Sequence, residues 1–263
     1  MTQDGVNPLQ RAISLRVETI FAERDDNVRA ACEYELELRF GNMRRVASGG
    51  TVFDAFVPKY LALGLFDVLC NKAAVDLCGE ERCDVEREAV RGRDNKTKQR
   101  VKHAAGHVGC ALTQKRVLLA PKDLPTTKRI EADVRVALER ETHCGTLPEC
   151  RGVRQRGNVV RRQRRSLRFI DSARGPNDFW RLDVTRLDDG KYYQLELELE
   201  FERALRVLRA ERAALANDDD CDAFQAFAKD EIVHRGMALV ALLEHYMLRT
   251  AEEYDRRTAF FAR

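Results

Sequence analysis

Apolar residues recur with two periods along this 263-residue chain, and each period predicts one kind of element. A helical spacing of three to four residues governs both ends of the chain and one internal stretch. It covers residues 8–24, 53–69 and the chain from 202 onward, where a long helix is expected after the acidic segment NDDDCD. Pro58 is expected in the first turn of the internal helix, because its fixed backbone φ suits that position.

Between these helices, apolar and polar residues alternate, as expected for strands with one buried face. Strands are predicted within 33–40, 84–103, 111–119, 131–141, 158–170, 179–187 and 192–201, the second of these being a hairpin turned by RGRDNKT. About eight strands flanked by helices predict an α+β fold built on an eight-stranded antiparallel β-barrel. No repeat or Pro/Gly/Ser-rich linker is found, so one domain is expected over 1–263, with the barrel at about 33–201.

Two of the predicted strands carry glutamates on one face. They are Glu33, Glu35 and Glu37, followed by Arg39, in the opening strand, and Glu196, Glu198 and Glu200 in the closing strand. A solvated outer face is one interpretation of either strand alone. However, Glu has a poor strand propensity, and directly opposed like charges cost up to about 1 kcal/mol per pair. Six glutamates therefore indicate a positive partner, such as a hard divalent cation that prefers oxygen ligands.

Residues 151–170 contain eight arginines and no acid, although the whole chain nearly balances 46 basic against 43 acidic side chains. Alternation places Arg162, Arg164 and Arg168 on one face, and Arg161 and Arg165 on the other. Neither face is apolar, so the pattern leaves the inward register open. A basic surface segment that contacts an RNA backbone, or a localisation signal, is the alternative interpretation.

Several other predicted strands also carry charged or polar groups on one face. These groups are Arg100 and Lys102, Thr113 and Lys115, Asp133, Arg135, Glu139 and Glu141, and Arg181, Asp183 and Thr185. A closed barrel with a charged lumen and an apolar outer wall under the helices would accommodate them. Buried charges need partners. A metal-bound polyphosphate would supply these partners, because Arg and Lys bind phosphate oxygens while Glu binds the metal.

The sequence does not support several other classes of protein. It has no HC-x5-R motif, no G-x4-GK-[ST] loop, and no Glu within the histidine pair at 103–107. The eight cysteines are interpreted as free thiols, since Cys78/Cys83 and Cys144/Cys150 lack zinc-site spacing. No run reaches about 18 apolar residues and the N-terminus lacks a signal-peptide pattern, so an intracellular protein without a membrane span is expected.

Four motifs resemble, in order, those of the metal-dependent RNA triphosphatases of fungal, protozoan and DNA-virus mRNA capping, in the triphosphate tunnel group. They are Glu35-Leu-Glu37-Leu-Arg39-Phe-Gly41, Arg162-Gln-Arg164-Arg165-Ser166, Leu182-Asp183-Val184-Thr185 and Glu196-Leu-Glu198-Leu-Glu200. The resemblance implies an eight-stranded tunnel that removes the γ-phosphate from triphosphate-ended RNA, with Mg²⁺ or Mn²⁺ as cofactor. The chain departs from the family's Arg-x-Lys-x-Arg strand, and its match around 100–115 is loose.

The resemblance also implies roles for individual residues. The metal ligands would be Glu35, Glu37 and Glu200, and the catalytic groups Glu196, Glu198, Arg162, Arg164 and Asp183. Substrate phosphates would be bound by Arg39, Arg100, Lys115, Arg162 and Arg164, with support from Thr185. Glu141 would be a structural carboxylate.

Two other functions stay open on the sequence: an inorganic or thiamine triphosphatase of the same tunnel fold, and a non-catalytic RNA-binding module. The small-molecule tunnel enzymes usually begin with the first glutamate strand, whereas about thirty residues precede it here. Expected partners are 5′-triphosphate RNA or nucleoside triphosphates, an mRNA guanylyltransferase from the pathway, and a second copy bound through 202–263. The nucleus, a viral factory and a virion all fit as compartments.

Overall fold

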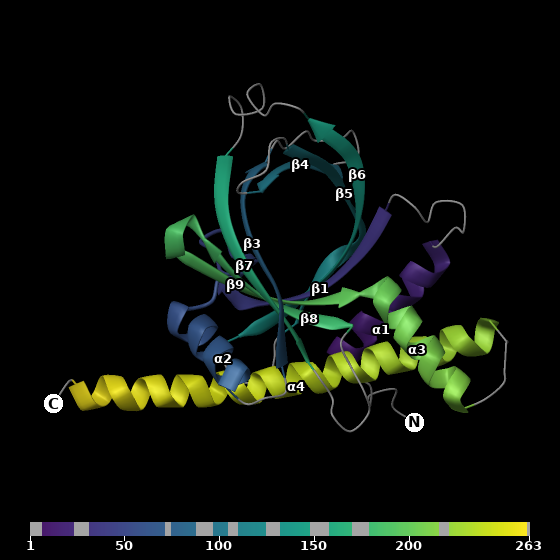
Figure 1. The fold of residues 1–263 in the computed structure, drawn as a ribbon. Helices are drawn as coiled ribbons and strands as arrows, with labels where there is room; N and C mark the ends of the chain where they lie inside the picture. The colour runs from purple at the N-terminus through teal and green to yellow at the C-terminus, as the bar shows by residue number, and fades with distance from the viewer. Residues whose placement is uncertain are drawn as a thin grey trace.

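Helices lie at both ends of the chain, and the strands lie mainly between them (Figure 1). The computed structural model describes residues 7–23, 32–71, 75–87, 97–104, 110–124, 132–147, 158–169, 179–215 and 221–261. The strands are β1 (Cys32–Arg45), β2 (Thr51–Asp54), β3 (Val75–Arg87), β4 (Thr97–Ala104), β5 (Cys110–Leu124), β6 (Asp133–Leu147), β7 (Asn158–Phe169), β8 (Trp180–Leu187) and β9 (Tyr192–Glu200). The helices are α1 (Pro8–Glu23), α2 (Lys59–Asn71), α3 (Phe201–Leu215) and α4 (Cys221–Phe261).

Eight of the strands form a closed ring. They pair antiparallel in the order β1-β6-β5-β4-β3-β7-β8-β9, and β9 pairs back with β1. β2 pairs only with the far end of β1, from Asn42 to Arg45, and so extends the sheet beyond the ring. The α+β fold and the eight-stranded antiparallel barrel predicted from the sequence are therefore confirmed.

The helix expected to open at Pro58 is found, but the helical spacing predicted from residue 53 was wrong for its first residues. Phe53 lies in β2, and α2 begins only at Lys59. The carbonyl of Pro58 accepts hydrogen bonds from the amides of Leu61 and Ala62, so the proline lies just before the helix. Phe53 is buried in β2, and the Arg135 guanidinium lies 4.5 Å from the centre of its ring. Periodicity alone cannot distinguish this short apolar strand from the first turn of a helix.

The apolar side of the ring faces outward, toward the helices. Leu36, Leu38 and Phe40 of β1 are at most 1% exposed and belong to the core shared with α1, α2 and α4. Trp180 of β8 is fully buried, and its indole N–H donates to the carbonyl of Ile232 in α4 at 3.2 Å. α4 runs across the barrel on the side opposite β4, β5 and β6 (Figure 1). Since side chains alternate along a strand, burying these faces turns the charged faces into the lumen.

Two sequence expectations concern features outside the barrel. None of the described helices combines the length and apolar character needed to cross a membrane. Cys70 and Cys221 are free thiols. The side chains of Cys78, Cys83, Cys144 and Cys150 lie outside the described part of the structure, so the absence of a zinc site there stays a prediction.

Candidate active site in the barrel lumen

The closing pair of strands brings the two glutamate runs together. Across β1 and β9, Glu35 lies opposite Glu200, and Glu37 lies opposite Glu198. On the other side of β1, the register places Glu139 of β6 opposite Glu35. Residues two positions apart on a strand point to the same face, so each of these glutamates points into the lumen. Carboxylates from three neighbouring strands therefore converge on one part of the lumen.

Lys115 of β5 lies among these carboxylates, with its side chain only 5% exposed. Its ammonium forms an ion pair with Glu35, lies 3.1 Å from Glu141 and 3.9 Å from Glu139. Burial nevertheless raises the pKa of Glu35 well above its ordinary value, and the neighbouring Glu37 and Glu141 add to this against the effect of Lys115. One ammonium thus leaves the negative charge of this cluster incompletely neutralised.

Arginines from β7 and β8 hold the carboxylates of β9. Arg168 binds Glu200 through two hydrogen bonds, of 2.7 and 3.0 Å. Arg181 reaches Glu200 at 3.0 Å and Glu198 at 2.7 Å. Burial raises the pKa of Glu198 to about 7, although the Arg181 guanidinium acts in the opposite direction. Although burial opposes its charge, the carboxylates of Glu198 and Asp183 raise the pKa of Arg181 above its ordinary value.

Asp183 holds two of these arginines in place through hydrogen bonds. Its side chain is fully buried and accepts hydrogen bonds from Ser166 at 2.7 Å, Arg181 at 2.9 Å and Arg164 at 3.3 Å. The strand register explains this arrangement, because Asp183 lies opposite Ser166 on β7. Thr185, opposite Arg164, is also buried. A carboxylate with this many donors fixes the direction of the guanidiniums that share it.

Arg39 lies deeper along the same face of β1. Its guanidinium forms ion pairs with Glu37 and, at 2.8 Å, with Glu196. Although burial opposes its charge, the carboxylates of Glu37 and Glu196 raise the pKa of Arg39 above its ordinary value. In this conformation Arg39 therefore neutralises acids of the lumen.

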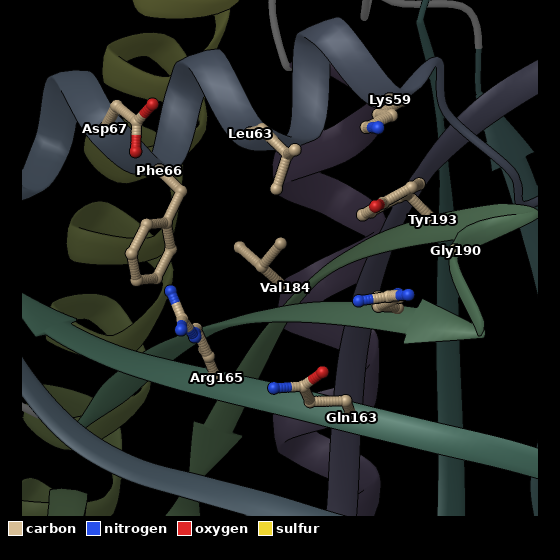
Figure 2. A pocket seen from close by; sticks show the side chains of 10 residues that line it. Lys59, Leu63, Phe66, Asp67, Gln163, Arg165, Val184, Gly190 and Tyr193 are labelled. Carbon is tan, nitrogen blue, oxygen red and sulfur yellow. The ribbon is translucent and has the colours of Figure 1, made fainter.

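The outer wall settles the register of the arginine strand. Gln163 and Arg165 line a pocket of about 340 Å³ between α2 and the outer face of β7 to β9 (Figure 2). There the Arg165 guanidinium lies 5.3 Å from the centre of the Phe66 ring, and Gln163 donates to Glu80 at 2.7 Å. Since residues alternate along β7, Arg162, Arg164 and Arg168 face the lumen. The sequence left the choice of inward face open. The structure turns inward the face with Arg162 and Arg164, the expected phosphate ligands.

Most of the predicted site residues converge on the lumen. For Arg100 the structure describes only the backbone, which pairs with Thr113. The side chain of Arg100 lies outside the described part of the structure. The structure adds Arg168, Arg181 and Glu139, which the sequence analysis placed on the right faces without assigning them to the site. Their alternation with Arg164, Asp183 and Glu141 was the signal that could have identified them.

The carboxylates fit a hard divalent cation in chemical type, and they lie on neighbouring strands. Glu35, Glu37 and Glu200 offer oxygen donors from two adjacent strands, and such cations prefer oxygen ligands. Among the described residues, no group of three His, Cys, Asp or Glu side chains is arranged as a metal site in the present conformation. The reason is visible in the contacts, because Lys115 and Arg168 occupy oxygens of Glu35 and Glu200. Cation binding would require these basic side chains to move.

Comparison with known proteins identifies structures with a similar fold. No family model and no curated protein matches the chain in sequence. The structure of the S. pombe Pct1 RNA triphosphatase in complex with the Spt5 CTD aligns over 92% of this chain and 95% of that chain, with a TM-score of 0.65. The chain has the fold of this RNA triphosphatase. Pct1 without the peptide gives a TM-score of 0.60 over 92% of this chain and 94% of that chain, and identity is 15% in both alignments.

Proposed function

We propose that this protein hydrolyses the γ-phosphate from the 5′-triphosphate end of RNA, the first step of mRNA cap formation, with a divalent metal as cofactor. The observation that carries the proposal is the pairing of Glu35 and Glu37 with Glu200 and Glu198 inside a closed ring, where β7 and β8 supply arginines to the same carboxylates. The shared fold with Pct1 and the order of the four motifs support it.

Glu35, Glu37 and Glu200 would hold Mg²⁺ or Mn²⁺. When bound, the cation would supply positive charge to the phosphate oxygens, as divalent ions do in phosphoryl transfer. The raised pKa of Glu35 agrees with this assignment, because a buried carboxylate short of positive charge gains most from a cation.

Arg162 and Arg164 of β7 would bind the phosphates, together with Lys115 and Arg100 from β5 and β4. Guanidiniums suit this task because their donors match phosphate oxygens in pairs. Asp183 would hold Arg164 in place, with Thr185 beside it. Arg39 would join the phosphate ligands by exchanging a carboxylate partner for the substrate.

Glu198 would take the proton from the attacking water. Burial raises its pKa to about 7, which places it in the range where a general base is effective near neutral pH. Glu196 would keep Arg39 in position through the contact of 2.8 Å. The remaining contribution would be positioning and charge stabilisation, which dominate phosphoryl transfer.

The deciding experiment is phosphate release from γ-labelled RNA, with Mn²⁺ or with EDTA, for the wild type and two variants. Glu35→Gln and Glu200→Gln should each lower the rate by about 100-fold or more, because each removes a charged metal ligand. Glu253→Gln, an exposed glutamate of α4, is the matched control and should keep full activity. Undiminished activity in EDTA, or in Glu35→Gln, would refute the proposal.

The same assay separates the alternatives. An inorganic or thiamine triphosphatase would release phosphate from those substrates faster than from RNA. A non-catalytic RNA-binding module would bind triphosphate RNA and release no phosphate with any metal, and its Glu35→Gln variant would bind RNA as well as the wild type.

Partners follow from the proposed reaction. The product would be RNA with a 5′-diphosphate, so an mRNA guanylyltransferase is the enzyme expected to use it. The S. pombe Pct1 structure holds the Spt5 CTD. A comparable peptide partner for this chain, and a homodimer through its C-terminal helices, belong to the same proposal.

A further inference from the structure

A pocket of about 320 Å³ lies at the end of the lumen where β1 begins and β9 ends. Its inner side consists of Glu35, Glu198 and Glu200. Its outer side consists of Arg203 and Arg206, which belong to α3 and not to the barrel. The pocket therefore connects the proposed metal ligands directly to a helix outside the ring.

The start of α3 is fixed at this mouth of the barrel. Phe201 follows Glu200 directly, and its ring makes edge contacts with Phe21 and Tyr34, at centroid distances of 5.3 and 6.4 Å. Leu205 and Leu208 bury the inner side of the helix. α3 then runs away from the barrel (Figure 1). Its position relative to the lumen is thus set by packing.

The exposed side of α3 carries a row of arginines that leads away from the mouth. Arg203, Arg206 and Arg209 are spaced by three residues, or about 4.5 Å along the helix axis. Arg206 and Arg209 are exposed, and the Arg209 guanidinium lies 5.2 Å from the centre of the Phe224 ring. This row is called the α3 arginine row below.

The charge along α3 changes from mixed at the mouth to positive beyond its first turn. Glu33 and Glu202 also line the mouth, and Arg203 lies 3.9 Å from Glu200. Beyond the first turn, the sequence has no acid until Glu211, which Arg235 holds at 2.6 Å. Within the described part of the chain, Arg206 makes no ion pair. Positive charge without an acidic partner among the described residues therefore begins at Arg206, one turn beyond the glutamates of the mouth.

Two arginines near the opposite end of the barrel, Arg135 and Arg44, have acidic partners. Arg135 binds Asp123 through two hydrogen bonds, of 2.6 and 3.0 Å. Arg44 of the β1–β2 extension lies 2.7 Å from Asp54. Arg206 differs from these two arginines, because it makes no ion pair with a described residue.

We propose that 5′-triphosphate RNA enters the lumen at the α3 mouth, and that Arg206 and Arg209 bind the backbone phosphates of its first nucleotides. This inference rests on the proposed function and adds a binding site outside the lumen. A single-stranded RNA continues past its triphosphate and reaches the α3 arginine row, whereas inorganic triphosphate ends inside the lumen. The row therefore gives the enzyme its preference for a polynucleotide substrate.

The test compares RNA with inorganic triphosphate for Arg206→Gln, the double variant Arg206→Gln/Arg209→Gln, and the control Arg249→Gln. Each lost arginine should lower kcat/KM for triphosphate RNA about fivefold relative to inorganic triphosphate, as expected for an exposed ion pair. The salt dependence of RNA binding should become shallower by about 0.7 in log–log slope per arginine removed. Arg249 is an exposed arginine of α4 outside the pocket, so its variant should keep the wild-type ratio.

Equal losses for both substrates, or none, in the double variant would overturn the inference while leaving the proposed hydrolysis intact. A wild type that hydrolyses neither substrate would instead refute the proposed function. In that case fluorescence anisotropy with a 3′-labelled triphosphate RNA decides the inference by itself. Weaker binding by the double variant, with unchanged binding by Arg249→Gln, supports the α3 arginine row, and equal binding refutes it.

Discussion

Burial and ion pairing act against each other at the carboxylates of the lumen. Glu35 pairs with Lys115, and Glu198 pairs with Arg181, yet burial raises the pKa of both acids. The protein therefore keeps these groups ionised only at a cost in free energy. A bound divalent cation would lower that cost, because it is the largest local charge in such a site. The carboxylates proposed to bind the metal thus also make the metal-free protein less stable.

The raised pKa of Glu198 predicts how stability changes with pH. The folded state holds this proton up to about pH 7, whereas an ordinary glutamate loses it near 4.5. The folded state thus binds more protons in this interval, so the free energy of unfolding should fall as pH rises from about 4.5 to 7. Thermal unfolding in EDTA across this range measures the effect. Glu198→Gln should reduce the slope and Glu253→Gln should not; an equal slope in both variants would contradict the assignment.

Asp183 should matter for stability as well as for activity. It is fully buried and accepts hydrogen bonds from Arg164, Arg181 and Ser166. Asp183→Asn would leave the guanidiniums short of negative charge, and breaking a buried pair in this way costs about 3 kcal/mol. Ser166→Ala, which removes one neutral donor, should cost only about 1 kcal/mol. Urea unfolding of both variants measures the difference, and similar losses would show that Asp183 acts as a simple acceptor.

Strands of this barrel are amphipathic in the reverse sense to an ordinary small barrel. β8 illustrates the arrangement, because Trp180 and Leu182 pack outward into the core with α4 while Arg181 and Asp183 face the lumen. The helices therefore cover the outside of the barrel, since without them the apolar outer faces would lie in water. Burying each large apolar side chain contributes about 1.5–3 kcal/mol.

Contact between β8 and α4 depends on a glycine. A Cβ at Gly236 would lie 2.8 Å from the fully buried Trp180 ring. Alanine is the better helix former by about 1 kcal/mol, yet overpacking of a core typically costs about 1–3 kcal/mol. Gly236→Ala should therefore lower the free energy of unfolding by up to about 2 kcal/mol, as measured by urea unfolding. An increase in stability would show that the indole ring can shift freely.

Closure of the ring is what creates the site at the level of the whole molecule. Glu35 and Glu200 are far apart in sequence, yet the β1–β9 pairing makes them direct neighbours. The strands that follow β9 in the sheet, β8 and β7, bring their arginines against the same carboxylates. α3 continues from the last strand and extends this charged surface beyond the mouth of the barrel.

The sequence by itself determined the helices at both ends, nearly all of the strands, and the alternation that puts Glu35, Asp183 and Glu200 on charged faces. These features are local, because the period of two or 3.6 residues is written in neighbouring positions. The spacing around Phe53 was misjudged as helical, since in the described structure β2 is defined by its pairing with the distant end of β1.

Tertiary structure alone decided which face of β7 points inward and what lies beyond the lumen. Both faces of that strand carry arginines, so hydrophobicity could not choose between them. The choice came from packing, because Arg165 lies against Phe66 of α2 on the outer wall. The place of α3 beside the mouth likewise depends on the contacts of Phe201 with Phe21 and Tyr34, which join distant parts of the chain.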